Sequence, residues 1–154
     1  MRVEREVLLP AAPERVWETV MDAHRLGEWV AIHAWARDAP EGPLEVGARF
    51  RQGLTLAGLP FEVRWTVVRA ERPALASWQG AGPAGSRAGV SYGLAPEGGR
   101  HTRFTYGLEL ALPGGPLALV AGPVVGVEAG RQADATLRRL GALLAGEASA
   151  DRLP

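Results

Sequence analysis

Apolar and charged residues alternate along several short segments of this chain, and this alternation limits its possible folds more than any other feature. The clearest case is residues 59–67, where apolar side chains alternate with Glu62, Arg64 and Thr66. A period of two places neighbouring side chains on opposite faces of a β-strand, so that one face is buried and the other meets water. Strands are also expected over residues 3–9, 32–37, 46–54, 75–80, 88–94 and 102–110.

Helical patterns interrupt these strands in two places. Residues 13–29 predict two short helices joined by a bend, because Pro13 suits a first helical turn and Asp22 can cap a second helix. Residues 116 to about 145 predict one long helix, which Gly122-Pro123 should kink or divide. The apolar stripe of this helix consists of Leu137, Leu140 and Leu144.

The order of these elements predicts an α+β fold. One strand, two short helices, six strands and a long helix give a seven-stranded curved antiparallel sheet that wraps around the C-terminal helix. The length of 154 residues suits one domain, which we place at residues 1–147, with 148–154 as a flexible tail.

The composition argues against several classes of function. Seventeen basic residues, all of them arginine, balance seventeen acidic ones, so the net charge gives no reason to expect a nucleic-acid partner. There is no cysteine for a disulfide or thiolate site, and no lysine for a Schiff base. The three histidines lack metal-ligand spacing and no phosphate-binding glycine motif follows a strand, so neither a metal nor a cofactor is expected.

The N-terminal sequence and the composition bear on the compartment and on the source organism. The charged N-terminal sequence lacks the apolar run of a signal peptide, which favours the cytoplasm. Two Gly-Pro pairs break the apolar segment at residues 113–127, so stable insertion into a membrane is not expected. The absence of asparagine, a thermolabile amide, resembles a thermophile composition.

Two short motifs point to a known family. After the first strand, residues 10–17 read Pro-Ala-Ala-Pro-Glu-Arg-Val-Trp, and residues 26–29 read Leu-Gly-Glu-Trp. With the order of elements, they resemble the START-like (SRPBCC) superfamily, and within it the polyketide cyclase/dehydrase and lipid transport group. The resemblance implies a helix-grip fold around a ligand cavity. Its members include lipid carriers, hormone and allergen-type binders and aromatic cyclases.

The apolar faces of the strands and the uncharged first half of the last helix supply the candidate ligand site. Small residues in that helix cannot fill the space inside a strongly curved sheet, and apolar pockets are the usual ligand sites. The predicted ligand-binding residues are Trp35, Phe50, Phe61, Val63, Trp65, Trp78, Tyr92, Phe104, Tyr106, Leu108, Val120 and Val124. A movable lid at Gly122-Pro123 would admit the ligand.

Three functions remain open. The leading one is binding or transport of a small hydrophobic or lipid-like molecule, without catalysis. The second is a cyclase or dehydratase acting on a polyketide-like substrate, in which a tyrosine, His33 or Arg64 would assist enolisation. The third is a protein-interaction module similar to the activators of chaperone ATPases. A cavity above about 300 Å³ would favour the first two over the third.

The assignment of side chains to the cavity depends on strand register. A shift of one residue turns every side chain of a strand to the opposite face. His33 and Trp35 are the residues most open to this error, because their strand is short and flanked by alanines.

Overall fold

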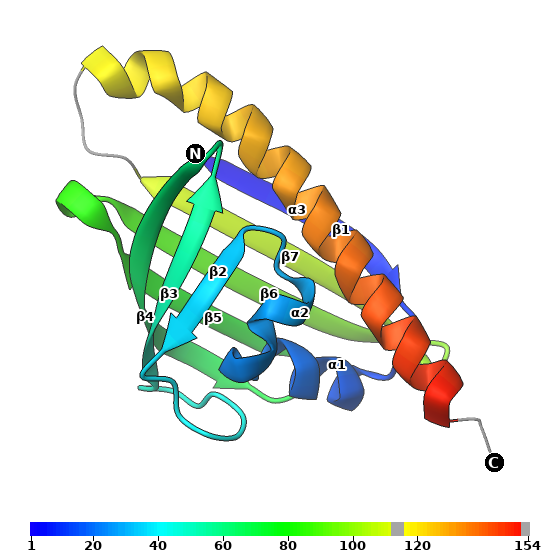
Figure 1. The fold of residues 1–154 in the computed structure, drawn as a ribbon. Coiled ribbons are helices and arrows are strands. Elements are labelled where there is room, and N and C mark those ends of the chain that lie inside the picture. Colours follow the sequence, from blue (N-terminus) through cyan, green and yellow to red (C-terminus); the bar gives the residue numbers. More distant parts are fainter. Residues whose placement is uncertain (112–115, 152–154) are drawn as a thin grey trace.

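The computed structural model describes residues 1–111 and 116–151, with side chains from 125 onward in the second range. The chain forms a curved sheet that wraps around a long helix (Figure 1). The seven strands lie in the order β1-β7-β6-β5-β4-β3-β2, and every neighbouring pair is antiparallel. The helix-grip fold is therefore confirmed. The elements are β1 (Arg2–Leu9), α1 (Pro13–Val20), η1 (Ala23–Arg25), α2 (Leu26–Trp29), β2 (His33–Arg37), β3 (Arg49–Leu56), β4 (Leu59–Glu71), β5 (Leu75–Ala81), η2 (Pro83–Gly85), β6 (Arg87–Glu97), β7 (His101–Ala111) and α3 (Pro116–Asp151).

The short helices begin where the local sequence favours it. Pro13 occupies the first turn of α1, and the Asp22 carboxylate accepts a hydrogen bond of 2.9 Å from the backbone N–H of His24 at the start of η1. Together, α1, η1 and α2 close one end of the curved sheet, while α3 runs along its open side next to β1 (Figure 1).

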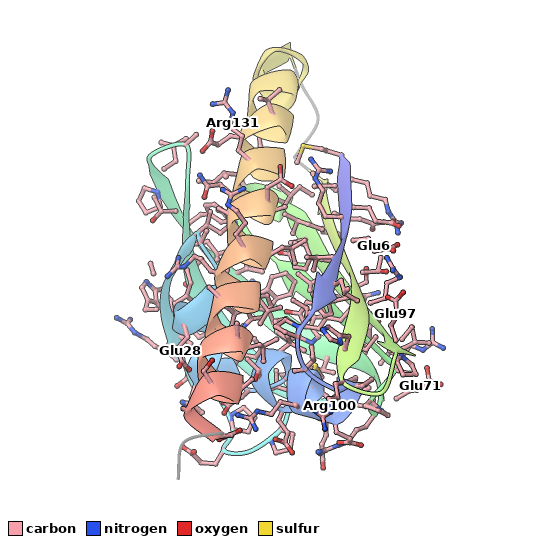
Figure 2. The ribbon with its side chains drawn as sticks, turned by 90° about the vertical axis from the view of Figure 1, so that its right-hand side faces the viewer. Glu6, Glu28, Glu71, Glu97, Arg100 and Arg131 are labelled. Atoms are coloured by element: carbon pink, nitrogen blue, oxygen red, sulfur yellow. The ribbon has the colours of Figure 1, made fainter. Side chains whose placement is uncertain are left out.

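The strands separate an apolar inner face from a charged outer face. On β7, for example, Phe104 and Tyr106 are buried while Arg103 is exposed. Figure 2 shows charged side chains such as Glu6 and Glu97 pointing away from the sheet, with α3 crossing its other side. We call the inner side of the sheet its concave face and the outer side its convex face.

The long helix agrees with one of the two forms expected for it at Gly122-Pro123, a kink rather than a division, and differs from expectation at its end. It is continuous from Pro116 to Asp151, so Gly122-Pro123 does not divide it, although its axis bends in its first, yellow part (Figure 1). It also continues past residue 147, and Asp151 forms a 2.8 Å ion pair with Arg15 of α1. Residues 148–151 are therefore helical rather than a flexible tail, and residues 152–154 lie outside the described residues.

Candidate functional site

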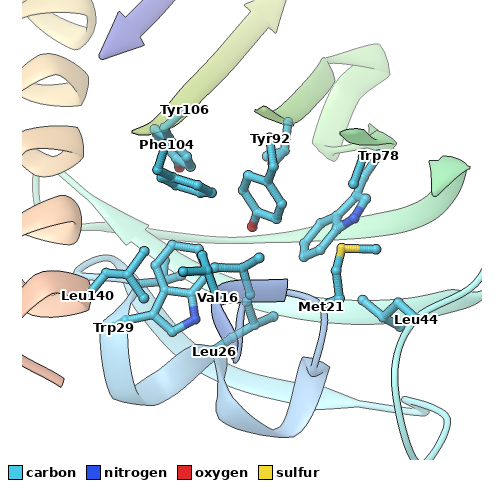
Figure 3. Close-up of a cluster of buried hydrophobic side chains, with 14 of the residues drawn as sticks. Val16, Met21, Leu26, Trp29, Leu44, Trp78, Tyr92, Phe104, Tyr106 and Leu140 are labelled. Carbon is cyan, nitrogen blue, oxygen red and sulfur yellow. The ribbon is translucent and has the colours of Figure 1, made fainter. Parts of the chain in front are cut away.

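Aromatic side chains fill the half of the interior nearest α1 and α2. Tyr92 is at the centre of this cluster, with ring centroids 5.4 Å from Trp78, 5.5 Å from Phe104 and 5.9 Å from Trp29. Figure 3 shows these rings packed against aliphatic side chains from α1, α2 and α3. This half of the interior is a packed core, and the rings leave little space for a guest.

A small cavity lies in the other half, between α3 and the far ends of the strands. Its volume is about 30 Å³. That is about a tenth of the volume usual for a ligand pocket, and enough for a water molecule. The lining residues come from β3, β4, β6, β7, α3 and the segment before β2: Ile32, Leu54, Leu56, Phe61, Val63, Trp65, Ala88, Tyr106, Leu108, Leu110, Ala129, Gln132, Ala133 and Thr136.

Three polar side chains face this otherwise apolar cavity. Thr136 accepts a 3.0 Å hydrogen bond from the backbone N–H of Ala31, and its hydroxyl hydrogen can still be donated. The amide nitrogen of Gln132 donates to Glu128 at 2.7 Å, which leaves its carbonyl oxygen able to accept. Burial raises the pKa of the Tyr106 phenol to about 12, so this group is a neutral hydrogen-bond donor near pH 7. These three side chains add hydrogen-bonding groups to an otherwise apolar lining.

A chain of hydrogen bonds holds one wall of the cavity. The indole N–H of Trp65 donates to Oε1 of the buried Gln52 at 2.8 Å, and Nε2 of Gln52 lies 3.0 Å from Nδ1 of His33. An indole N–H can only donate, so the amide must present its N–H to His33, and His33 must accept through an unprotonated Nδ1. Burial lowers the pKa of His33, in agreement with a neutral ring.

The structure divides the predicted ligand-binding residues into four groups. Phe61, Val63, Trp65, Tyr106 and Leu108 line the cavity. Phe50, Trp78, Tyr92 and Phe104 lie in the aromatic core instead, because the curved sheet brings their rings into contact with one another. The side chains of Val120 and Val124, and with them the contacts expected of a lid at this point, lie outside the described residues.

Trp35 forms the fourth group, and the prediction that it faces the cavity is wrong. Its cross-strand partner is Gly53, whose neighbours Gln52 and Leu54 point inward, so Trp35 and Gly53 share the convex face. A register shift between His33 and Trp35 is the cause. Such a bulge inserts one extra residue, so His33 points inward while Trp35, two positions later, points outward.

The cavity is also lined by residues that were not among the predicted ligand-binding residues. On α3, Ala129, Gln132, Ala133 and Thr136 follow the spacing of three and four residues that places side chains on one helical face. The spacing of these small and polar residues could have identified them. Leu54 and Leu56 were not predictable in this way, because their role depends on how far the β3–β4 hairpin extends beyond the rest of the sheet.

The titratable groups considered for catalysis mostly lie away from the cavity. Arg64 is exposed on the convex face, and His33 reaches the cavity only through Gln52 and Trp65. Of the groups proposed to assist enolisation, Tyr106 alone lines the cavity. Within the described residues there is no cluster of three metal-ligating side chains.

The sequence and the fold of this chain are both similar to those of known proteins. A family model described as polyketide cyclase / dehydrase and lipid transport matches residues 1–145. The chain belongs to this family. The polyketide cyclase / dehydrase and lipid transport family has a ligand-binding fold. None of the described helices is both long enough and apolar enough to cross a bilayer.

Relatives in this family extend over most of the chain. The uncharacterized protein Rv1546 of Mycobacterium tuberculosis is 30% identical over 128 residues, which cover 80% of this chain and 87% of that protein. Toxin Rv0910 of the same organism is 33% identical over 90 residues, or 58% of this chain and 62% of the toxin. The solved structure of TTHA0849 from Thermus thermophilus has a TM-score of 0.78 and 19% identity, and the match covers 96% of this chain and 99% of that one. This last likeness shows the shared fold.

Proposed function

We propose that this protein binds a small apolar or lipid-like molecule between α3 and the far end of the sheet. The observation that carries the proposal is the cavity itself, which is apolar on nearly every side and has Tyr106, Gln132 and Thr136 as its polar groups. Ligand sites of this kind combine an apolar lining with a few polar groups that orient the guest. Ala129 and Ala133 have small side chains, so α3 leaves space between itself and the sheet at this point.

A guest of ordinary size needs more room than 30 Å³, and one wall of the cavity is suited to move. We call residues 54–63 the β3–β4 arm. Its β3 part, residues 54–56, pairs with residues 59–61 of β4, and β4 meets β5 only from Arg64 onward. On its other side the arm meets β2 at Leu54, and the backbone N–H of Thr55 donates a 2.9 Å hydrogen bond to the carbonyl of Ile32, just before β2. A two-stranded ribbon has little stability of its own, so the arm can move away from α3 at low cost. We therefore infer that ligand entry displaces this arm.

The experiment is a fluorescence titration with N-phenyl-1-naphthylamine, a neutral apolar probe. We expect saturable binding to the natural protein, at least tenfold weaker in Ala133→Leu because the larger side chain fills the cavity. Ala142→Leu, an exposed position on the same helix, is the matched control and should bind like the natural protein. A lack of saturable binding, or equal binding by Ala133→Leu, would refute the proposal.

A second candidate is the protein-interaction module, and the small volume of the cavity favours it. In that case the interior serves only as a core and the outer surface meets a partner. The same titration separates the two candidates, because an interaction module without an expandable cavity leaves the probe in water at every protein concentration.

A further inference from the structure

Arginines gather at one end of the convex face in an arrangement that is unfavourable in the free protein. Arg37 of β2, Arg51 of β3 and Arg64 of β4 are direct cross-strand partners, so three cationic side chains form one row. Arg49 is two residues from Arg51 on the same face. Like charges directly opposite one another destabilise a sheet, so this row calls for an explanation.

Acidic residues neutralise only part of this charge. Arg51 pairs with Glu62 and, at 3.1 Å, with Asp38. Arg37, Arg49 and Arg64 have no acidic partner among the described residues, so four arginines face two carboxylates.

The opposite end of the same face is arranged differently. There Arg2 pairs with Glu109 and Arg103 with Glu6, at 2.8 and 2.7 Å. The chain as a whole carries no net charge, so the excess of positive charge is local to the β2–β4 end.

Trp35 fixes part of the row in place. The guanidinium carbon of Arg37 lies 4.4 Å from the centroid of the Trp35 ring, and that of Arg51 lies 5.7 Å from it. Such cation–π contacts hold both groups near one aromatic surface. Gly53 is what allows this, because a Cβ at that position would lie 2.6 Å from Cδ1 of Trp35. Arg37 and Arg51 are therefore held in position before any ligand arrives.

A hollow of about 490 Å³ lies beside the row. Its polar lining consists of Arg49, Arg51 and Arg64, the Thr66 hydroxyl and one carboxylate, that of Asp38, which is already paired with Arg51. Guanidinium groups donate several hydrogen bonds in a planar fork that matches the oxygens of a phosphate, and the threonine hydroxyl adds another donor. Ala81 is the cross-strand partner of Arg64, and its small side chain leaves the other side of the hollow open.

We propose that this hollow is a binding site for a phosphoryl group, held by Arg49, Arg51 and Arg64, of which Arg51 is positioned by its contact with the Trp35 ring. The site is on the convex face, so it does not depend on ligand binding in the interior cavity. The phosphoryl group can belong to a free phosphorylated molecule or to the headgroup of an anionic lipid, since both present the same oxygens.

The test is a calorimetric titration with inorganic pyrophosphate at low ionic strength. We expect saturable binding to the natural protein and at least a tenfold loss of affinity in the double variant Arg49→Gln/Arg64→Gln, since each charge-assisted hydrogen bond contributes substantially. Affinity should also fall as added salt shortens the range of these charges. Arg138→Gln removes an exposed arginine of α3 and serves as the control, with unchanged affinity.

Stability separates a binding role from a structural one. Removal of Arg64 relieves its repulsion with Arg51, so the melting temperature of the double variant should equal or exceed that of the natural protein. Pyrophosphate should raise the melting temperature of the natural protein but not that of the double variant.

Vesicles identify the source of the phosphoryl group. Sedimentation with phosphatidylcholine vesicles that contain phosphatidic acid, but not with pure phosphatidylcholine, would indicate a lipid headgroup. Binding of pyrophosphate without sedimentation would indicate a free phosphorylated molecule. Failure to bind either probe, or equal binding by the double variant, would overturn the proposal.

Discussion

Replacement of Gln52 by leucine tests whether the hydrogen-bond chain behind the cavity wall has the role that its geometry indicates. The side chain is 3% exposed, accepts from the Trp65 indole at 2.8 Å and lies 3.0 Å from Nδ1 of His33. Leucine has a similar size but removes the acceptor, which leaves a buried indole N–H without a partner. Such a loss costs about 1–3 kcal/mol, and burial of the more apolar leucine offsets part of it.

We therefore expect Gln52→Leu to lower the free energy of unfolding by about 1–2 kcal/mol. For a chain of this length that corresponds to a fall of about 2–8 °C in melting temperature. Urea unfolding followed by circular dichroism measures the free energy directly. Gln79→Leu, an exposed glutamine on β5, is the matched control, and its change should stay within about 0.5 kcal/mol.

A double-mutant cycle assigns the loss to the hydrogen bond. In a Trp65→Phe background the indole N–H is absent, so Gln52→Leu should cost clearly less than in the natural protein. The amide also favours the neutral form of His33, so its removal should raise the pKa of that ring, which NMR can follow. A Gln52→Leu protein as stable as the natural one, with an unchanged pKa at His33, would refute this account of the wall.

Three further predictions follow from burial and packing. Burial lowers the pKa of His33 below its ordinary value of 6.5, so as the pH falls the imidazole is protonated in the unfolded chain before it is protonated in the folded protein. The urea concentration at the unfolding midpoint should therefore decrease as the pH is lowered below about 6.5, and it should decrease less in His33→Phe than in His24→Phe. The pKa of Tyr106 is raised to about 12, so tyrosinate absorbance at 295 nm from this residue should appear only near that pH, and stability should decline above pH 10. Gly80→Ala should lower the free energy of unfolding, measured in urea, by about 1–3 kcal/mol, because the new Cβ would lie 2.8 Å from the Trp65 indole. Gly89→Ala is its control, since a Cβ there meets only an ordinary contact at 3.6 Å.

Most of the fold could be predicted from the sequence because periodicity reports burial directly. The alternation in residues 59–67 located β4, and Leu137, Leu140 and Leu144 are buried on α3 as expected. Where the prediction ended β4 at residue 67, the strand continues to Glu71. Strand ends depend on pairing with neighbouring strands, which periodicity does not report.

The site was harder to predict because an inward-facing side chain can be either core or cavity lining. Tyr92 and Tyr106 both point inward, yet only Tyr106 lines the cavity. The difference depends on how closely α1 and α2 approach one half of the sheet. Trp35 shows a second limit, since a single bulge in β2 reverses its face and no residue type marks that bulge.

The central claim is that the β3–β4 arm moves away from α3 to admit an apolar guest, and the distance between these two elements tests it most directly. The chain contains no cysteine, so Leu59→Cys on the arm and Val127→Cys on α3, both at exposed positions, can carry spin labels without competing sites. We predict that the distance distribution from pulsed electron paramagnetic resonance shifts to longer values as N-phenyl-1-naphthylamine saturates the protein. An unchanged distribution with the probe bound would contradict the claim.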